Sequence, residues 1–138
     1  MSSLSTAASS EEGEGHLVLK VDVFGSQESL DHDSGKFYTE YVLRCACQGP
    51  DGRTRSWETL RRYREFCAID ILLREKYPHL ASSFPSLPSK KYLGSSLSSD
   101  FVEKRQRELG YYIDALLSLY PQILQDEIVD EFLEVSCH

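Results

Sequence analysis

The sequence lacks a long apolar segment. Among its 138 residues, no run approaches the roughly 18 apolar residues that a membrane-spanning helix needs. The N-terminus also lacks a basic region followed by an apolar stretch, which a secretory signal would show. We therefore expect no transmembrane segment and only peripheral contact with any membrane. Residues 1–15 are mostly Ser, Ala, Glu and Gly, and predict a flexible tail ahead of one domain at residues 16–138.

Metal-binding and catalytic motifs are also missing. Neither a Cys-x-x-Cys pair nor a Cys/His cluster, the usual signs of a zinc site, is present, so we interpret the four cysteines as reduced cytosolic thiols: Cys45, Cys47, Cys67 and Cys137. The four histidines are scattered, and the chain has no Gly-rich phosphate loop, Gly-x-Ser-x-Gly or paired-His motif. We expect no metal, no cofactor and no enzymatic activity.

An overall excess of basic charge is absent as well. The net charge is −7 and the pI is near 5.1, which argues against a general affinity for acidic partners and against nucleic-acid binding. The basic residues are nevertheless concentrated in one stretch. Residues 53–107 hold 12 Lys and Arg against 6 Asp and Glu, whereas the rest of the chain holds 3 against 16. This concentration indicates an anion site, although a solvated face would show the same pattern.

The apolar residues in the first half of the chain alternate. This period of two predicts a strand from Leu17, a second over residues 37–48 and a third over residues 53–62. A polar loop is expected at residues 25–36, and Gly-Pro-Asp-Gly at residues 49–52 indicates a tight turn. Three successive antiparallel strands of this kind form a meander.

The pattern then changes to a helical period. Apolar spacing predicts a helix over residues 66–77, ended by Pro78, and a second helix that begins at Asp100. Between them lies a long irregular segment rich in proline and serine, and a last short helix is expected over residues 127–135. This order predicts an α+β fold, in which a three-stranded antiparallel β-meander packs against a helical subdomain, with a polyproline loop between the first two main helices.

Three arginines gather at the expected junction between the third strand and the first helix, in Arg61-Arg62-Tyr63-Arg64. Guanidinium groups this close repel one another unless an anion lies among them, and their planar fork suits phosphate. The neighbouring Tyr63 could pack its face against a sugar ring. The alternative interpretation is a solvated cluster at a strand end.

Two further features follow along the chain. Residues 84–90 (Phe-Pro-Ser-Leu-Pro-Ser-Lys), which we call the polyproline arm, favour a stiff extended conformation that ends in Lys90. In the second helix, Arg105 lies on the apolar stripe, where a buried guanidinium needs a partner. The polyproline arm alone would also suit a ligand of a polyproline-binding domain. For Arg105, the alternative is a structural ion pair with an acidic residue of the first helix.

In this order and spacing, these motifs resemble the PX (phox-homology) domain family, whose sorting-nexin-like members bind phosphoinositides. Arg62-Tyr63-x-x-Phe66 is similar to the family's Arg-Tyr-x-x-Phe signature. The polyproline arm resembles the family's apolar-Pro-x-x-Pro-x-Lys loop, and Arg105 stands where the family has an arginine early in the next helix. The resemblance implies a membrane-targeting module that recognises phosphatidylinositol 3-phosphate.

The resemblance also implies a role for each residue. Arg62, helped by Arg64, would bind the 3-phosphate, and Tyr63 would stack under the inositol ring. Lys90 would bind the 1-phosphate, and Arg105 would bond the 4- and 5-hydroxyls. The chain would lie on the cytosolic face of endosomal, vacuolar or lysosomal membranes, contacting the bilayer through Phe37, Lys91, Tyr92 and Leu93. An aromatic residue and a leucine beside basic residues suit a water–lipid boundary, although Tyr92 and Leu93 could equally pack back on the domain.

Two alternatives to this function remain at the level of sequence. One is a broader phosphoinositide binder, because lipid choice varies within the family. The other is a protein-interaction module that uses the Pro-x-x-Pro motif of the polyproline arm.

Overall fold

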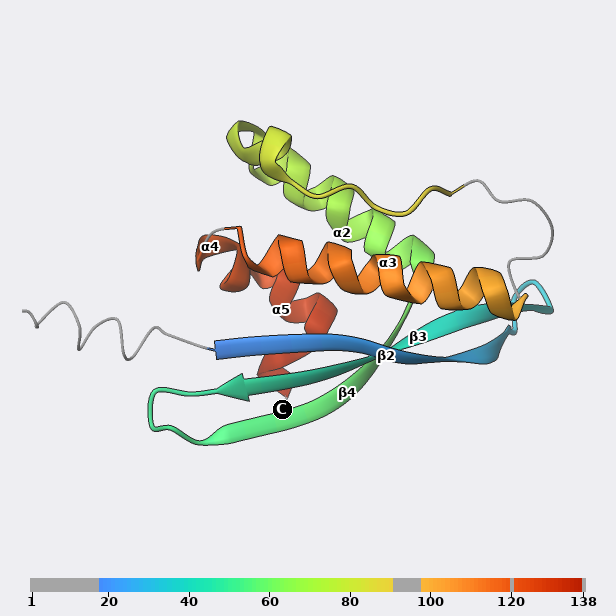
Figure 1. The fold of residues 1–138 in the computed structure, drawn as a ribbon, viewed down its shortest axis with the longest axis horizontal. Coiled ribbons are helices and arrows are strands. Elements are labelled where there is room, and N and C mark those ends of the chain that lie inside the picture. Colours follow the sequence, from blue (N-terminus) through green and yellow to red (C-terminus); the bar gives the residue numbers. More distant parts are fainter. Residues whose placement is uncertain (1–17, 91–97, 120, 138) are drawn as a thin grey trace, which may run out of the picture.

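A three-stranded antiparallel sheet forms one layer of the molecule, and helices cover one of its faces (Figure 1). The computed structural model describes residues 18–90, 98–119 and 121–137. The tail predicted at residues 1–15 lies outside these ranges. Consecutive strands are neighbours, so the sheet is a meander: β2 (Val18–Asp31), β3 (Lys36–Gln48) and β4 (Thr54–Arg62). The predicted α+β fold is confirmed.

The first strand is longer than the sequence predicts, and the loop expected over residues 25–36 is wrong. β2 stays paired with β3 as far as Asp31, with one register shift between Val23 and Gly25. The side chains of this outer stretch are mostly polar and exposed, so its pairing depends on backbone hydrogen bonds that leave no alternating apolar pattern. The connecting turn shrinks to residues 32–35.

The helical layer follows the strands along the chain. Two helices are long, α2 (Tyr63–Lys76) and α3 (Ser99–Leu117), and two are short, α4 (Pro121–Leu124) and α5 (Glu127–Leu133). A 3-10 helix follows α2, η1 (Pro78–Ser83), and another follows α5, η2 (Val135–Cys137). Figure 1 shows α3 running along the sheet above β2. In the described ranges, no helix combines the length and the apolar character needed to cross a membrane.

Both long helices begin slightly earlier than their apolar spacing predicts. The Glu65 side chain accepts a hydrogen bond from the Arg62 backbone N–H (2.8 Å), so α2 begins directly where β4 ends. The Ser98 hydroxyl accepts from the Phe101 N–H (3.4 Å) and caps α3, where the sequence placed the start at Asp100. Because β4 and α2 share this junction, the arginines there are held between the sheet and the helices.

The core lies between the sheet and the helices. Alternate residues of β3 point inward, as their period predicts, and they pack with Trp57 of β4 against the helices. The most deeply buried side chains include Tyr41, Leu43, Cys45, Phe66, Leu73, Leu109, Tyr112, Ile113 and Leu133. All four cysteines are free thiols, and burial raises the pKa of Cys45 to about 12, so this thiol is neutral at physiological pH.

Candidate functional site

A small open cavity lies where β3, the end of β4, the start of α2, the polyproline arm and α3 meet. Its volume is about 250 Å³, and it is lined by Phe37, Tyr38, Thr39, Tyr41, Arg62, Tyr63, Arg64, Lys90 and Arg105. The structure therefore brings together all five residues predicted to contact a headgroup. Four of these nine residues are cationic and none is acidic, so the cavity carries positive charge that suits an anion.

Arg105 supplies the buried charge of the cavity. The residue is only 7% exposed, and its guanidinium lies between two aromatic rings, with Cζ 3.7 Å from the Tyr63 centroid and 4.4 Å from the Phe101 centroid. Its Nη2 donates to the Ser89 carbonyl oxygen (2.8 Å), while its buried Nε has no hydrogen-bond partner among the described residues. A buried guanidinium with an unused donor is costly unless a ligand or a water molecule completes its bonding.

The sequence left open a structural ion pair between Arg105 and an acidic residue of the first helix. In the structure, the acidic residue Asp70 of the first helix contacts other partners. Asp70 of α2 forms an ion pair with Arg74 (Nε to Oδ2, 2.9 Å) and accepts a hydrogen bond from the Tyr112 hydroxyl (2.8 Å). Within the ranges that the structure covers, Arg105 forms no ion pair, so its positive charge is left for the cavity.

Arg62 lies at the edge of the cavity and is only partly buried. Its guanidinium stacks on the Tyr38 ring, with Cζ 3.8 Å from the centroid. Its Nη1 is 3.7 Å from the Asp31 carboxylate, and the Arg62 side chain is 23% exposed. Stacking on an aromatic ring keeps the guanidinium in place while its N–H donors remain available at its edges.

Arg61 points the other way, so the idea of three arginines around one anion is wrong for this residue. Its Nε donates to the Phe132 carbonyl oxygen (2.9 Å), its Nη2 pairs with Glu134 (3.1 Å), and its other donors reach two further carbonyl oxygens. Successive residues of a strand face opposite sides, and the inner side of β4 faces α5 at this point. Arg61 therefore ties the sheet to the last helix.

The remaining two cations are exposed. Arg64 lies in the first turn of α2, and Lys90 ends the polyproline arm. Neither forms an ion pair with a residue of the described ranges. Both line the same cavity, although they lie 26 positions apart in the sequence.

The polyproline arm is held against the domain by its backbone. The Tyr63 hydroxyl donates to the Pro88 carbonyl oxygen (2.6 Å), and Arg74 donates to the carbonyl oxygens of Ala81 (3.1 Å) and Pro85 (2.8 Å). Burial raises the pKa of Tyr63 to about 12, so the hydroxyl remains a donor at neutral pH. With Pro88 buried, the arm presents little of its Pro-x-x-Pro motif to a partner, which weighs against the protein-interaction alternative.

Comparison with known proteins decides the family. The sequence model of the PX domain matches residues 50–136. The chain belongs to the PX domain family. The folded unit extends back at least to β2, because this strand pairs along almost its whole length with β3.

Relatives of this PX domain include sorting nexins. Sorting nexin MVP1 of Candida albicans is 37% identical over 78 residues, which cover 56% of this chain and 10% of the relative. Sorting nexin-1 of Rattus norvegicus is 30% identical over 111 residues, which cover 74% of this chain and 21% of the relative. The chain thus spans only a tenth to a fifth of the length of these curated relatives. Membership of this family supports a phosphoinositide-binding, membrane-targeting module.

Solved PX domains superpose over most of the chain. A designed CISK-PX domain is 30% identical, with a TM-score of 0.68, covering 83% of this chain and 98% of that structure. The mouse SNX19 PX domain with a bound sulphate ion is 27% identical, with a TM-score of 0.69, covering 87% of this chain and 99% of that structure. The shared unit therefore includes all three strands and the helices.

Sequence reasoning missed several residues around the cavity of this PX domain. Tyr38 supports Arg62, Phe101 covers Arg105, and Tyr41 lines the cavity from β3. The role of Tyr38 could not be predicted from the sequence, because its partner across the sheet belongs to the part of β2 that was predicted to be a loop. Phe101 stands four positions before Arg105 on α3, a spacing that places both on one helix face and could have revealed it.

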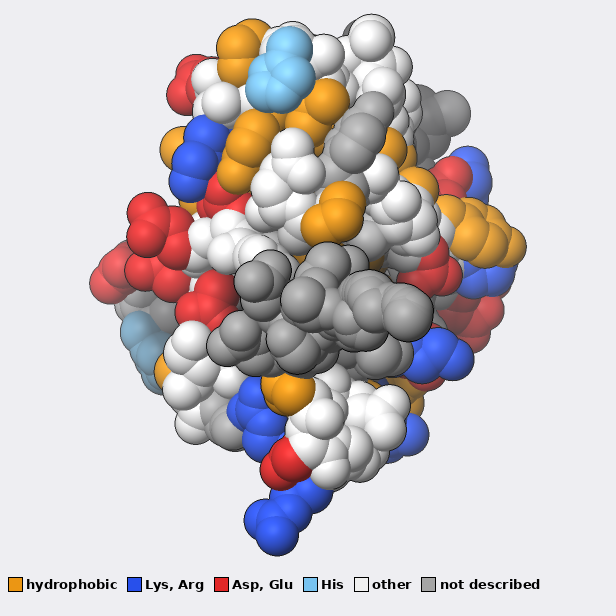
Figure 2. Space-filling view, turned by 90° about the vertical axis from the view of Figure 1, so that its left-hand side faces the viewer, with side chains coloured by type: hydrophobic (Ala, Val, Ile, Leu, Met, Phe, Trp, Pro, Cys, Tyr) orange, Lys and Arg blue, Asp and Glu red, His pale blue; other side chains and the backbone are white. Residues whose placement is uncertain are grey.

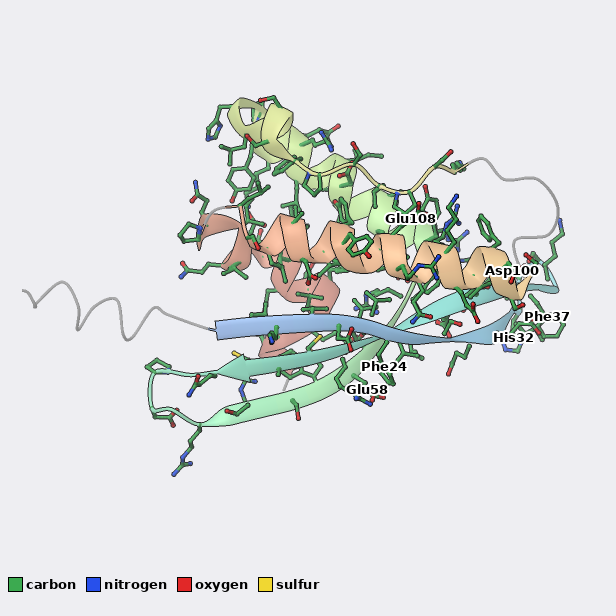
Figure 3. The ribbon with its side chains drawn as sticks, in the orientation of Figure 1. Phe24, His32, Phe37, Glu58, Asp100 and Glu108 are labelled. Carbon is green, nitrogen blue, oxygen red and sulfur yellow. The ribbon has the colours of Figure 1, made fainter. Side chains whose placement is uncertain are left out.

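The outer end of the β2–β3 hairpin carries exposed apolar side chains near the cavity. Phe37 is 57% exposed, and its partner across the two strands, Leu30, is 40% exposed. Figure 3 shows Phe37 and His32 together at this end of the molecule, below the N-terminal end of α3 with Asp100. The other residues predicted to contact a membrane, Lys91, Tyr92 and Leu93, lie outside the described residues.

Proposed function

We propose that the cavity binds the headgroup of phosphatidylinositol 3-phosphate and so holds the chain on the cytosolic face of endosomal-type membranes. The observation that carries the proposal is Arg105, a buried cation with an unused donor at the wall of a cavity with three further cations. At about 250 Å³, the cavity is slightly smaller than the roughly 300 Å³ at which small-molecule sites usually begin, which suits one sugar ring.

The proposed roles distribute the four cations around the ring. Arg62 and Arg64 bind the 3-phosphate from the β4–α2 junction, and Lys90 binds the 1-phosphate from the polyproline arm. Arg105 bonds the 4- and 5-hydroxyls with donors that Ser89 leaves free. The bound sulphate of the mouse SNX19 PX domain supports the proposal, because sulphate has the shape and charge of a phosphate group.

Tyr63 has a more restricted role than simple stacking. The Arg105 guanidinium already covers one face of its ring, so the inositol would use the opposite face. Its hydroxyl also positions the polyproline arm through Pro88. Tyr63 would thus shape the site on both sides, by holding Arg105 and by fixing the segment that ends in Lys90.

The preference for the 3-monophosphate follows from the residues available. Arg105 is the single cation assigned to the 4,5 edge of the ring, and hydroxyl groups satisfy it. A lipid with phosphates at these positions would need further cations there, and none of the nine lining residues is free for that role. Selectivity would therefore come from the small number of donors rather than from steric exclusion.

Membrane contact would come from the hairpin end beside the cavity. Leu30 and Phe37 are apolar and exposed, and Phe37 also lines the cavity. Inserting such side chains into the interface adds an apolar contribution that salt does not screen. Lys91, Tyr92 and Leu93 remain proposed contacts on the basis of the sequence.

Liposome sedimentation with a panel of phosphoinositides tests the proposal. Vesicles are matched in total charge, and the 3-monophosphate should sediment the most protein. Equal binding to the 4,5-bisphosphate would reject the assignment of Arg105 and favour the broader phosphoinositide binder. Protein that stays in the supernatant with every lipid would favour the protein-interaction module.

A further inference from the structure

The Asp31 carboxylate lies beside the cation proposed to bind the 3-phosphate. Its Oδ2 is 3.7 Å from Nη1 of Arg62, and the two side chains are 24% and 23% exposed. The other carboxylate oxygen, Oδ1, accepts hydrogen bonds from the backbone N–H groups of Asp33 (3.0 Å) and Ser34 (3.4 Å). The turn that ends β2 therefore fixes this carboxylate independently of Arg62.

Asp31 lines a second hollow to which Arg62 also contributes. This second hollow is about 520 Å³ in volume, and it shares Tyr38, Arg62 and Arg64 with the headgroup cavity. Its lining combines four carboxylates with three arginines: Asp31, Asp33, Glu40 and Glu65, and Arg61, Arg62 and Arg64. Arg62 thus lines both a hollow that contains carboxylates and a cavity that contains none.

We propose that Asp31 is an affinity-determining residue of the headgroup site, whose fixed carboxylate competes with the lipid phosphate for Arg62. The inference rests on the proposed function, because it concerns the strength of the same interaction. A guanidinium that already has an anion on one side gains less from a second anion on the other. The Asp31 carboxylate therefore weakens the binding of a phosphate at Arg62.

The opposite role, in which Asp31 orients Arg62 and strengthens binding, fits the geometry less well. A separation of 3.7 Å is too long for a directed hydrogen bond. The orientation of Arg62 comes from Tyr38, on whose ring it stacks at 3.8 Å, and from Glu65, which holds its backbone N–H at 2.8 Å. Asp31 therefore contributes a negative charge near Arg62 but does not orient the Arg62 side chain. The backbone hydrogen bonds of its turn lower the pKa of Asp31, so it is ionised at neutral pH.

Asp31→Asn is a conservative test of this proposal. The amide oxygen can still accept the hydrogen bonds of Asp33 and Ser34, so the turn is kept while the charge is removed. Titration calorimetry with soluble, short-chain phosphatidylinositol 3-phosphate avoids any membrane contribution. At low salt we expect about threefold to tenfold tighter binding, shrinking as the ionic strength rises.

Asp33→Asn is the matched control. It makes the same change in net charge two residues along the same turn, and Asp33 is exposed and forms no ion pair with the residues described. We expect its affinity to stay within about twofold of the unmodified chain. An equal gain for both variants would mean a general charge effect and would overturn the proposal.

The remaining outcomes separate this inference from the proposed function. Suppose that the unmodified chain binds the lipid and that Arg62→Ala abolishes this binding. Weaker or unchanged binding by Asp31→Asn would then overturn the proposed competition and leave the proposed function standing. An equal gain from Asp31→Asn in an Arg62→Ala background also overturns the proposed competition, because no competition for Arg62 is left to relieve. If neither the unmodified chain nor the Asp31→Asn variant binds the lipid, the proposed function and this inference are both overturned.

Discussion

At the scale of the residue, two adjacent arginines serve different parts of the molecule. Arg61 and Arg62 follow one another at the end of β4, so their side chains leave the strand on opposite faces. Arg61 meets the carbonyl oxygens of α5, whereas Arg62 meets the Tyr38 ring at the cavity. Identical chemistry therefore gives a structural contact in one case and a candidate ligand contact in the other.

This difference predicts opposite results for two alanine variants. Arg62→Ala should reduce headgroup affinity by about tenfold to a hundredfold, because a charge-assisted bond to phosphate contributes about 1.5–3 kcal/mol. Its melting temperature should change little. Arg61→Ala should instead lose about 1–3 kcal/mol of stability, because it removes the hydrogen bonds to the Phe132 and Glu131 carbonyl oxygens and the ion pair with Glu134. Calorimetric titration and thermal melting of both variants check this, and a large stability loss in Arg62→Ala would mark that residue as structural.

Asp126 is a buried carboxylate at the start of α5, and three donors surround it. The residue is 5% exposed and caps α5 by accepting from the Ile128 N–H (2.8 Å), while Lys76 (2.8 Å) and the Tyr77 hydroxyl bond its other oxygen. Burial alone would raise the pKa of this carboxyl, but these three donors together hold it below its ordinary value of 3.8. A carboxyl with a lowered pKa stabilises the fold above its unfolded pKa, and this contribution is lost as the pH falls through the folded value.

We therefore predict that Asp126→Asn reduces stability at neutral pH by about 1–2 kcal/mol and makes it less sensitive to acid. The free energy of unfolding of the unmodified chain should fall more steeply than that of the variant as the pH drops below 3.8. Urea denaturation at a series of pH values measures both slopes. Parallel slopes would show that Asp126 does not contribute to the acid transition.

At the scale of the element, the polyproline arm works as a support for the cavity. Its carbonyl oxygens are bonded at Pro85, Pro88 and Ser89, by Arg74, Tyr63 and Arg105 in turn. These bonds place Lys90 next to Arg105 and Tyr63. The three donors belong to α2 and α3, so the arm is bonded to both long helices.

Tyr63→Phe tests this support. The variant keeps the ring that contacts Arg105 and removes the hydrogen bond to the Pro88 carbonyl oxygen (2.6 Å). One such bond contributes about 0.5–1.5 kcal/mol, so headgroup affinity should fall by about threefold to tenfold. Hydrogen exchange at the amides of the polyproline arm should rise in parallel. Unchanged exchange with reduced affinity would mean that the hydroxyl contacts the ligand directly.

At the scale of the whole molecule, the cavity and the exposed apolar pair lie at the same end. Figure 3 places Phe37 at the outer end of the β2–β3 hairpin, beside the cavity that it lines. Figure 2 shows the opposite end, where acidic and basic side chains are interspersed. The net charge of the chain is negative, so general attraction to an anionic membrane is weak, and under the proposed function docking would depend on this one end.

We predict that replacing Leu30 and Phe37 by serine weakens binding to vesicles more than binding to the soluble headgroup. Partial insertion of two apolar side chains contributes a fraction of the about 1.5–3 kcal/mol of full burial each, so vesicle affinity should fall about tenfold. The matched control replaces Ile71 and Leu72 of α2, which are 56% and 48% exposed but do not line the cavity. Equal losses in both double variants would show that the hairpin end has no special role.

The sequence by itself determined most of the architecture, because the spacing of apolar residues reports which face of an element is buried. Alternation on β3 predicted its inward face, and helical spacing predicted α2 and α3 to within a few residues. The position of Arg105 on an apolar stripe indicated burial, and the structure confirms it. The motif resemblance nominated the five residues that the cavity brings together, although their contacts with a ligand remain predictions.

Only the tertiary structure decided the contacts between elements. The outer half of β2 is polar, so nothing in its own pattern showed that it pairs with β3. Arg61 turned towards α5 and not towards the other arginines, and Asp31 came to lie beside Arg62 from a turn 31 positions earlier. The physical reason is common to all three. Burial along one element is written in its local sequence, whereas strand register, the direction of a side chain at a strand end and the approach of distant charges depend on how separate elements pack together.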